Sequence, residues 1–363
     1  MDLLKDTKNT FDFNTLIIAP FPRSIKYEGI KQVALGYYHR YENINLKPLL
    51  VVPMCGDVPP GYKYHCVLKR KSFFGSLLIF IRMACFIYKC RESTKTIVIL
   101  ENSLATPFLT IFTRSLNYEG MLVVHFLCPV LVASEVFKVL VAYREKQIML
   151  HLLLNNFFFA KLSSLLLSRN GNYFVGSNFQ KVQLEKYGIR SKVINPYANG
   201  NSNKAVKHSS RSSRKSFRLG YLGHFSGIKG VDLLINAFNN LSEEIEYLEL
   251  FIAWSGLGGE REKVTNMIRN SKNFGRIFQY GIVKPLDFLC DIDLLVLPYK
   301  INSVPIPPAV LHEAFVVGTK VLISDTPGLA GLYESGCSFF KANNLVSLEK
   351  EVVTIITHGR QTD

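Results

Sequence analysis

Residues 219–234, LGYLGHFSGIKGVDLL, indicate the fold of the second half of the chain. The stretch begins as an apolar strand, turns at Gly223, passes Lys229 and continues as a helix. A glycine at such a turn lets the backbone approach a phosphate closely, and the amides of the helix start, together with the Lys229 ammonium, would hold a diphosphate. An ordinary βα turn with a surface lysine explains the stretch equally well.

A second signal lies in residues 298–328, PYKINSVPIPPAVLHEAFVVGTKVLISDTPG. A proline-rich loop is followed by a short helix that carries Glu313 and ends at Gly318. A carboxylate one turn inside a helix can accept hydrogen bonds from two vicinal hydroxyls, as on a ribose. The alternative is a solvated helix glutamate, the more common fate of a single Glu.

Short apolar runs without polar alternation recur along the whole chain, separated by segments of helix length. The expected strands are residues 15–19, 49–53, 96–100, 121–126, 173–175, 217–222, 248–253, 276–280, 294–297 and 320–324. This pattern predicts an α/β protein with parallel sheets covered on both faces. Residues 201–216, NSNKAVKHSSRSSRKS, have almost nothing to bury, so we expect them to link a domain of residues 1–200 to one of residues 217–363.

The composition favours anionic partners. The 363 residues carry 43 Lys and Arg against 28 Asp and Glu, a net charge of +15. Residues 1–200 hold 25 basic and 12 acidic side chains, and residues 201–363 hold 18 and 16. Nucleic acid, a membrane surface and phosphorylated substrates fit this balance. No nucleic-acid-binding motif frames the basic residues, so we expect no nucleic-acid partner.

Cysteine usage and hydropathy point to a cytosolic setting. The seven cysteines form no C-x-x-C pair, which argues against a zinc or redox motif. The N-terminal stretch has no signal-peptide core, and no run reaches the roughly 20 apolar residues of a membrane span. Asp291 and Asp293 form a D-x-D, a pair that can hold a metal ion and a diphosphate when it follows a strand. Here the pair precedes a strand, so Asp293 is instead expected to start that strand.

The segments described above, in this order, resemble the donor-binding domain of glycosyltransferase family 4, the retaining GT-B enzymes. The matching positions are Gly223, Lys229, Gly230, Gly256, Gly258, Leu297, Pro298, Glu313, Ala314, Gly318 and Gly328. The likeness before about residue 170 is looser and rests on Gly29 and His125, with residues 174–189 as further support. The resemblance implies the GT-B architecture, two Rossmann-like βαβ domains that face each other across a cleft.

The resemblance also implies roles. The second domain would bind a nucleotide-sugar donor and the first a glycan or lipid-linked acceptor, with retention and with no metal or other cofactor. Lys229 would neutralise the diphosphate leaving group, Glu313 would hold the ribose, and His125 would lie near the sugar or the incoming hydroxyl. These three are the candidate catalytic residues. The remaining donor-binding positions would be Gly29, Gly223, His224, Gly256, Gly258, Tyr280, Gly281, Ile282, Pro308 and Ala309.

Several residues depart from the family pattern. His224 stands where the family usually has Arg, and Pro305 stands where the first of two glutamates is expected. Pro307 and Pro308 remove amide donors from the loop. We therefore weigh two functions: a glycosyltransferase of cell-surface polysaccharide or glycoconjugate biosynthesis, and a catalytically inactive GT-B relative that serves as a membrane-associated partner subunit.

Two apolar stretches bear on membrane contact. Residues 69–91, KRKSFFGSLLIFIRMACFIYKCR, place Lys71, Arg82 and Lys89 on one helical stripe, so this helix either lies on an anionic leaflet or is buried in the first domain. Residues 151–167, HLLLNNFFFAKLSSLLL, are expected to be core. With the basic first half, this predicts a cytoplasmic protein, peripheral on the inner face of the plasma membrane.

Overall fold

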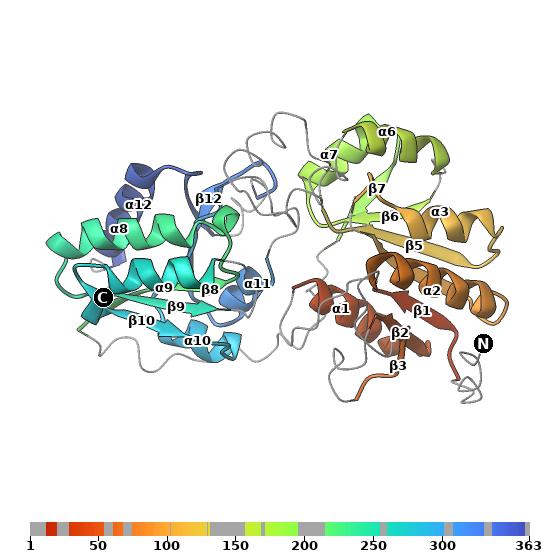
Figure 1. Cartoon of the computed structure of the whole chain (residues 1–363), viewed down its shortest axis with the longest axis horizontal. Helices are drawn as coiled ribbons and strands as arrows, with labels where there is room; N and C mark the ends of the chain where they lie inside the picture. The colour runs from red at the N-terminus through yellow and green to blue at the C-terminus, as the bar shows by residue number, and fades with distance from the viewer. Residues whose placement is uncertain are drawn as a thin grey trace. The chain divides into compact units, whose positions relative to one another are not determined.

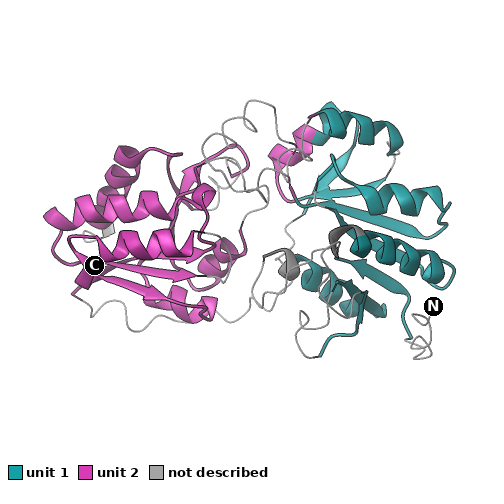
Figure 2. Ribbon diagram, in the orientation of Figure 1, with its two compact units in different colours: residues 1–127, 158–175, 184–200 teal, residues 128–157, 176–183, 201–363 magenta. Residues whose placement is uncertain are grey.

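The chain forms two compact α/β units, each built on one parallel sheet (Figure 1). Unit 1 consists of residues 1–127, 158–175 and 184–200, and unit 2 of residues 128–157, 176–183 and 201–363 (Figure 2). The computed structural model describes residues 12–19, 29–53, 61–67, 75–101, 103–128, 130, 157–167, 171–194, 215–254, 260–300, 308–329 and 336–359.

The sheet of unit 1 has the strand order β3-β2-β1-β4-β5-β6-β7 and is parallel throughout. Its strands are β1 (Thr15–Ile18), β2 (Pro48–Val52), β3 (Tyr64–Cys66), β4 (Thr96–Glu101), β5 (Met121–Phe126), β6 (Asn172–Val175) and β7 (Ser191–Val193). Its helices are α1 (Gly29–Asn43), α2 (Gly75–Cys90), α3 (Phe108–Ser115), α6 (Phe157–Leu166) and α7 (Asn178–Lys186). Every position of β1, β2 and β4 is buried, as expected of strands covered on both faces.

Helix α2 belongs to the core of unit 1. Ile79, Met83 and Ile87, spaced four residues apart, are buried against a cluster that includes Leu16 and Val51. Of the three basic residues on the predicted stripe, Arg82 donates its guanidinium to the Val67 carbonyl at 2.9 Å, Lys89 is exposed, and Lys71 lies outside the described residues. The structure thus shows that one face of this helix is buried, and contact of its other face with a membrane stays a prediction.

The sheet of unit 2 has the order β10-β9-β8-β11-β12-β13 and is also parallel. Its strands are β8 (Phe217–Gly223), β9 (Leu248–Trp254), β10 (Ile277–Tyr280), β11 (Leu294–Leu297), β12 (Lys320–Asp325) and β13 (Ser338–Lys341). Two 3₁₀ turns, η2 (Gly227–Lys229) and η3 (Phe274–Arg276), lie between strands. The strands β9 and β10 lie on one side of β8, and β11, β12 and β13 lie on its other side. The strand order therefore reverses between β8 and β11, and the carboxyl ends of these two strands flank the switch point where ligands bind in sheets of this type.

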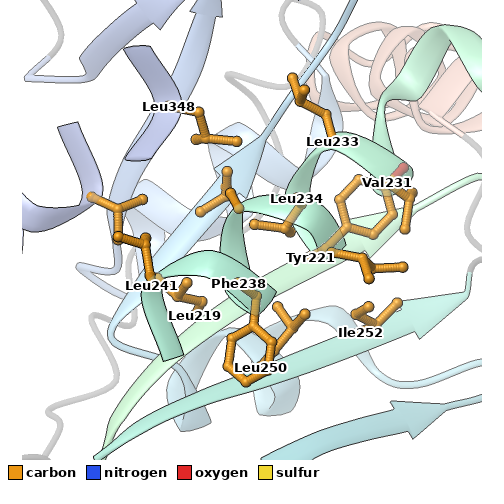
Figure 3. Close-up of a cluster of buried hydrophobic side chains, with 14 of the residues drawn as sticks. Leu219, Tyr221, Val231, Leu233, Leu234, Phe238, Leu241, Leu250, Ile252 and Leu348 are labelled. Atoms are coloured by element: carbon orange, nitrogen blue, oxygen red, sulfur yellow. The ribbon is translucent and has the colours of Figure 1, made fainter. Parts of the chain in front are cut away.

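Helices cover both faces of this second sheet. On one face α8 (Val231–Glu244), α9 (Arg261–Arg269) and α12 (Leu345–Gly359) bury a core that includes Tyr221, Phe238 and Leu348 (Figure 3). On the other face α10 (Pro285–Asp291) and α11 (Ala309–Val316) bury Phe288, Leu289 and Leu311 against the alternate residues of the strands. Together the two cores fix the strand ends from which the site residues project.

Two further findings concern expectations about single segments. Asp293 does sit at the start of a strand: its carboxylate accepts the Arg218 amide at 2.8 Å at the amino end of the sheet. In the part of the chain that the structure describes, no helix combines the length and the hydropathy needed to cross a membrane.

Candidate functional site

The turns that follow β8 and β11 touch each other at the carboxyl edge of the second sheet. The Lys300 amide donates to the Ile228 carbonyl at 3.0 Å, and the Lys300 ammonium pairs with the Asp232 carboxylate at 2.6 Å. The residue between Ile228 and Gly230 is Lys229. These contacts join the two turns across the switch point. We call the joined segments, which are η2 with the start of α8 and residues 298–300, the closed rim.

Gly230 makes this contact possible. It has φ +70°, and a Cβ built on it would lie 1.8 Å from the Pro298 carbonyl oxygen. Any side chain at this position would therefore meet both the strain of left-handed backbone and a backbone clash.

We expect Gly230→Ala to destabilise the protein by clearly more than Gly318→Ala. Gly318 also has a left-handed φ, +67°, but a Cβ there meets nothing within 4 Å, so its variant bears only backbone strain of about 1 kcal/mol. Gly230→Ala bears the same strain and must also push the 298–300 segment away, and we expect about 3 kcal/mol or more. Denaturant unfolding of both variants measures the difference, and equal losses would contradict the rim contact.

Lys229 ends η2, and its ammonium sits over an aromatic ring. The Lys229 Nζ lies 4.4 Å from the centroid of the buried Tyr299 ring. Burial lowers the pKa of Lys229 to about 8. A ring face holds a cation without occupying its N–H donors, so the ammonium keeps hydrogen bonds to give to an anion.

Gly223 and His224 form the first part of the same turn. The Tyr221 hydroxyl donates to the His224 carbonyl at 2.7 Å, and a Cβ on Gly223 would lie 2.9 Å from that hydroxyl. A side chain at 223 would therefore displace the buried Tyr221 hydroxyl, which is a second reason for glycine there beside the phosphate approach that the sequence suggested.

Glu313 lies in the second turn of α11 and is half-buried, and burial raises its pKa to about 7. Helix α11 begins at Ala309, directly after Pro308 at the N-cap position. A proline there removes an amide donor from the loop, as the sequence suggested, but leaves the first-turn amide donors of α11 in place. Pro305 and Pro307 lie outside the described residues, as do Gly256 and Gly258.

The end of β10 offers an exposed aromatic and apolar rim. Tyr280 stacks on Phe251, with ring centroids 5.9 Å apart, and both Tyr280 and Ile282 are exposed. Gly281 between them has open space at its Cβ position. Two strand spacings, about 10 Å, separate β10 from β8, so this rim belongs to the same sheet edge as Lys229.

In unit 1 the candidate residue His125 is fully buried at the end of β5. The Tyr37 hydroxyl, from α1, lies 3.0 Å from the His125 Nδ1. Burial and, less strongly, the Arg40 charge lower the pKa of His125 to about 3, so the ring is neutral at physiological pH. Within the described residues His125 Nε2 has no hydrogen-bond partner, so it is available to a water molecule or a ligand.

Tyr37 was missed from the sequence, and the direction of its hydrogen bond to His125 Nδ1 depends on the tautomer of the ring. A phenol that donates to Nδ1 leaves the ring proton on Nε2, which then presents a donor. Gly29, the other candidate in this unit, is the first residue of α1, the helix that carries Tyr37. A second buried group, Glu101, is already engaged: it accepts the Thr110 amide and hydroxyl, each at 2.8 Å, at the start of α3.

We expect Tyr37→Phe to change which ring nitrogen of His125 carries the proton, because the variant removes the hydrogen bond at Nδ1. The lost hydrogen bond is worth about 1 kcal/mol of stability, and any step that uses the Nε2–H donor should slow by about tenfold. Nitrogen-detected NMR of the imidazole gives the tautomer directly. Tyr41→Phe is the matched control, because Tyr41 lies on the same helix and stacks on Tyr37. An unchanged tautomer in Tyr37→Phe would contradict the role of Tyr37.

The structure does not gather ligands for a metal at any of these positions. In the described ranges, no group of three or more His, Cys, Asp and Glu side chains is arranged to hold an ion. Sequence reasoning missed Tyr37, which contacts His125, and Tyr299, which lies under the Lys229 ammonium. It also missed the Lys300–Asp232 ion pair, which joins the two turns beside Lys229.

Comparison with known proteins finds a family model that matches much of the second half of the chain. Residues 216–358 match the family described as Glycosyl transferases group 1. No curated protein matches the chain by sequence.

Several solved structures share the fold over nearly the whole chain. The crystal structure of Anabaena HepE in complex with UDP-glucose has a TM-score of 0.69 at 16% identity, covering 96% of this chain and 91% of HepE. WaaG, a glycosyltransferase involved in lipopolysaccharide biosynthesis, gives 0.64 at 13% identity, with 94% and 90% coverage. The lipopolysaccharide outer core galactosyltransferase WaaB gives 0.59 at 14% identity, with 95% and 90% coverage. These proteins support the α/β architecture of two Rossmann-like domains that the sequence predicts.

Proposed function

We propose that this chain transfers a sugar from a nucleotide-sugar donor to a glycan or lipid-linked acceptor. The chain belongs to the group 1 glycosyltransferases through residues 216–358, and it has the GT-B fold. The transfer would retain the anomeric configuration, use no metal and serve cell-surface polysaccharide or glycoconjugate biosynthesis. It would resemble family 4 in these respects.

The observation that carries this proposal is the closed rim at the switch point of the second sheet. One side of the rim contributes Lys229, and α11, which follows the other side in the chain, contributes Glu313. A diphosphate beside Lys229 would meet a cation whose donors are free of the Tyr299 ring, and a ribose further along the edge would meet the Glu313 carboxylate. The exposed Tyr280 offers the nucleobase a ring on which to stack.

In this mechanism the protein stabilises the leaving group and supplies no covalent chemistry. As the glycosidic bond to the diphosphate breaks, negative charge grows on the β-phosphate, and the Lys229 ammonium is placed to neutralise it. His224 is a weaker cation than the arginine of the family pattern, so more of this stabilisation rests on Lys229. From unit 1, His125 would serve the sugar or the acceptor hydroxyl through Nε2.

A thermal-shift screen against UDP, GDP, ADP and their sugars tests donor binding, and product analysis with the best donor tests transfer. UDP sugars come first, because the HepE structure holds UDP-glucose. A saturable shift with donor cleavage supports the enzyme. A shift without cleavage or transfer supports the inactive relative acting as a membrane-associated subunit, and no shift with any nucleotide contradicts both.

A further inference from the structure

Helices α8 and α9, which pack against each other on one face of the second sheet (Figure 1), enclose an open groove. Its volume of about 710 Å³ lies within the range of about 300–1,000 Å³ that is typical of small-molecule sites. Asparagines line both walls: Asn236 and Asn239 of α8, and Asn266 and Asn270 in α9 and at its end. Side chains three or four residues apart share one face of a helix, so each pair forms one wall. We call this site the α8–α9 groove.

Helix stability does not explain these asparagines. Asparagine is a poor helix former, because its amide competes with the backbone for hydrogen bonds, yet Asn236, Asn239 and Asn266 all lie inside helices. Asn236 and Asn266 are exposed, and their side chains form no hydrogen bond with any other described residue. Alanine would favour both helices more, so the two amides indicate a use other than folding.

Contacts at both ends of the α8–α9 groove hold its walls in place. At the carboxyl edge of the sheet, the Glu260 amide donates to the Phe225 carbonyl at 3.1 Å, which joins the start of α9 to the turn after β8. At the other end, the Ser271 hydroxyl donates to the side-chain oxygen of Asn239. This bond leaves the two N–H donors of the Asn239 amide for a ligand. The groove is therefore preformed, which lowers the entropy that a ligand must lose on binding.

The remaining lining residues select the class of ligand. Ile235 and Met267 add apolar surface, against which the C–H groups of a sugar ring can pack. Glu260, Glu262 and Lys263 complete the lining, two acids against one base, in a chain whose net charge is +15. This balance disfavours phosphates and other anions. Amides and carboxylates together offer donors and acceptors, which match neutral hydroxyls because each hydroxyl can both donate and accept.

We propose that the α8–α9 groove binds a neutral oligosaccharide. An extended peptide is a poorer occupant, because its recognition takes specificity from pockets for alternate side chains, and this groove presents amides along both walls. The lining shares no residue with the candidate donor site, so this inference goes beyond sugar transfer and does not depend on donor chemistry. The groove would hold a glycan on unit 2 whether or not a nucleotide is bound.

Binding of the dye-labelled full chain to an array of defined neutral and acidic oligosaccharides, and to an array of unmodified peptides, tests the class of ligand. We expect binding to neutral oligosaccharides, and calorimetric titration with the strongest of them gives its affinity. Asn236→Ala/Asn266→Ala should weaken this affinity about tenfold or more, because the sugar hydroxyls lose hydrogen-bond partners on both walls. Its melting temperature should equal or exceed that of wild type, because alanine is the better helix former. A structural role for the two amides would lower it.

The matched control is Asn240→Ala, which removes an asparagine of α8 that lies outside the groove and donates to the Glu349 carboxylate of α12 at 2.6 Å. This control should bind the oligosaccharide like wild type. Both variants should keep the thermal shift with nucleotides, because that shift reports the donor site.

Three results would overturn the proposal: no binding to any neutral oligosaccharide, a preference for acidic oligosaccharides or peptides, or full affinity in Asn236→Ala/Asn266→Ala. The last result would mean that the glycan binds elsewhere on the chain. Because the array needs no nucleotide and the thermal-shift screen needs no glycan, failure of this proposal and failure of the proposed function are read separately.

Discussion

Lys229→Ala should lower the rate of donor cleavage by about 10²–10³-fold, the loss seen when one preorganised charge-stabilising donor is removed from a developing anion. The loss should appear in kcat as well as in kcat/KM, because the diphosphate carries more negative charge in the transition state than in the bound donor. Steady-state release of the nucleoside diphosphate measures it. The matched control is Lys320→Ala, an exposed lysine at the amino end of β12, on the opposite edge of the same sheet.

The pH profile gives this prediction a second readout. The pKa of Lys229 is lowered to about 8, so the free enzyme loses the cation as pH rises through that value, and kcat/KM should fall on the alkaline side. Lys229→Arg should retain the charge and move this limb to higher pH, because a guanidinium does not titrate in this range. If Lys229→Ala keeps full activity and an unchanged profile, Lys229 is not the residue that stabilises the leaving group.

Glu313→Gln should change stability and affinity in opposite directions. The pKa of Glu313 is raised from 4.5 to about 7, so between these values the folded state holds a proton that the unfolded state releases. The free energy of unfolding contributed by this group therefore falls as pH rises from about 4.5 to about 7, and the full penalty is present above that range. Glutamine carries no charge at any pH, so the variant should be about 1–3 kcal/mol more stable than wild type near pH 8 and equal to it near pH 4.

The same variant should bind nucleotide about tenfold more weakly, because hydrogen bonds from ribose hydroxyls to a carboxylate become bonds to a neutral amide. Thermal melts across pH and calorimetric titration with the nucleoside diphosphate measure the two effects. Glu262→Gln, an exposed glutamate on α9, is the control and should change neither. A variant with unchanged nucleotide affinity would remove Glu313 from the ribose site, whatever its stability.

The sheets were predictable from sequence where their strands are long and buried. The apolar runs at β1, β2, β4, β5, β8, β9 and β11 each identified a strand, because only a strand covered on both faces combines that length with that hydropathy. The strands β3, β7 and β13 were missed. They have three or four residues each with mixed burial, so their polar positions gave no run to detect. Helix α10, which is seven residues long and begins at Pro285, was also missed, because so short a segment shows no clear helical pattern.

The two apolar helices show what composition alone cannot decide. Both α2 and α6 are rich in large apolar residues, yet α2 buries Ile79, Met83 and Ile87 while α6 buries only small residues on its inner stripe. Which stripe faces inward depends on the space that the neighbouring elements leave, and no local pattern records that space. Apolar character predicted that each segment contacts something apolar, but which residues of each helix are buried had to come from the structure.

The candidate site was predictable one segment at a time, but its supports were not. Lys229 stood out because it lies at a strand-to-helix turn, and Glu313 because it is a carboxylate inside the short helix that follows a proline-rich loop. Tyr299, Lys300 and Tyr37 carry no such mark, because their roles depend on partners 70, 68 and 88 residues away in the chain, respectively Lys229, Asp232 and His125. A contact over that separation is set by topology and leaves no pattern in a single sequence.

Three consecutive residues after β11 each hold a different part of the opposite turn: Pro298 meets Gly230, Tyr299 lies under Lys229, and Lys300 binds both Ile228 and Asp232. An insertion or deletion within this triplet would put all of these contacts out of step at once, whereas a single substitution would lose only one. Among descendants of this gene, the spacing here should therefore be held more strictly than the identity of any one side chain.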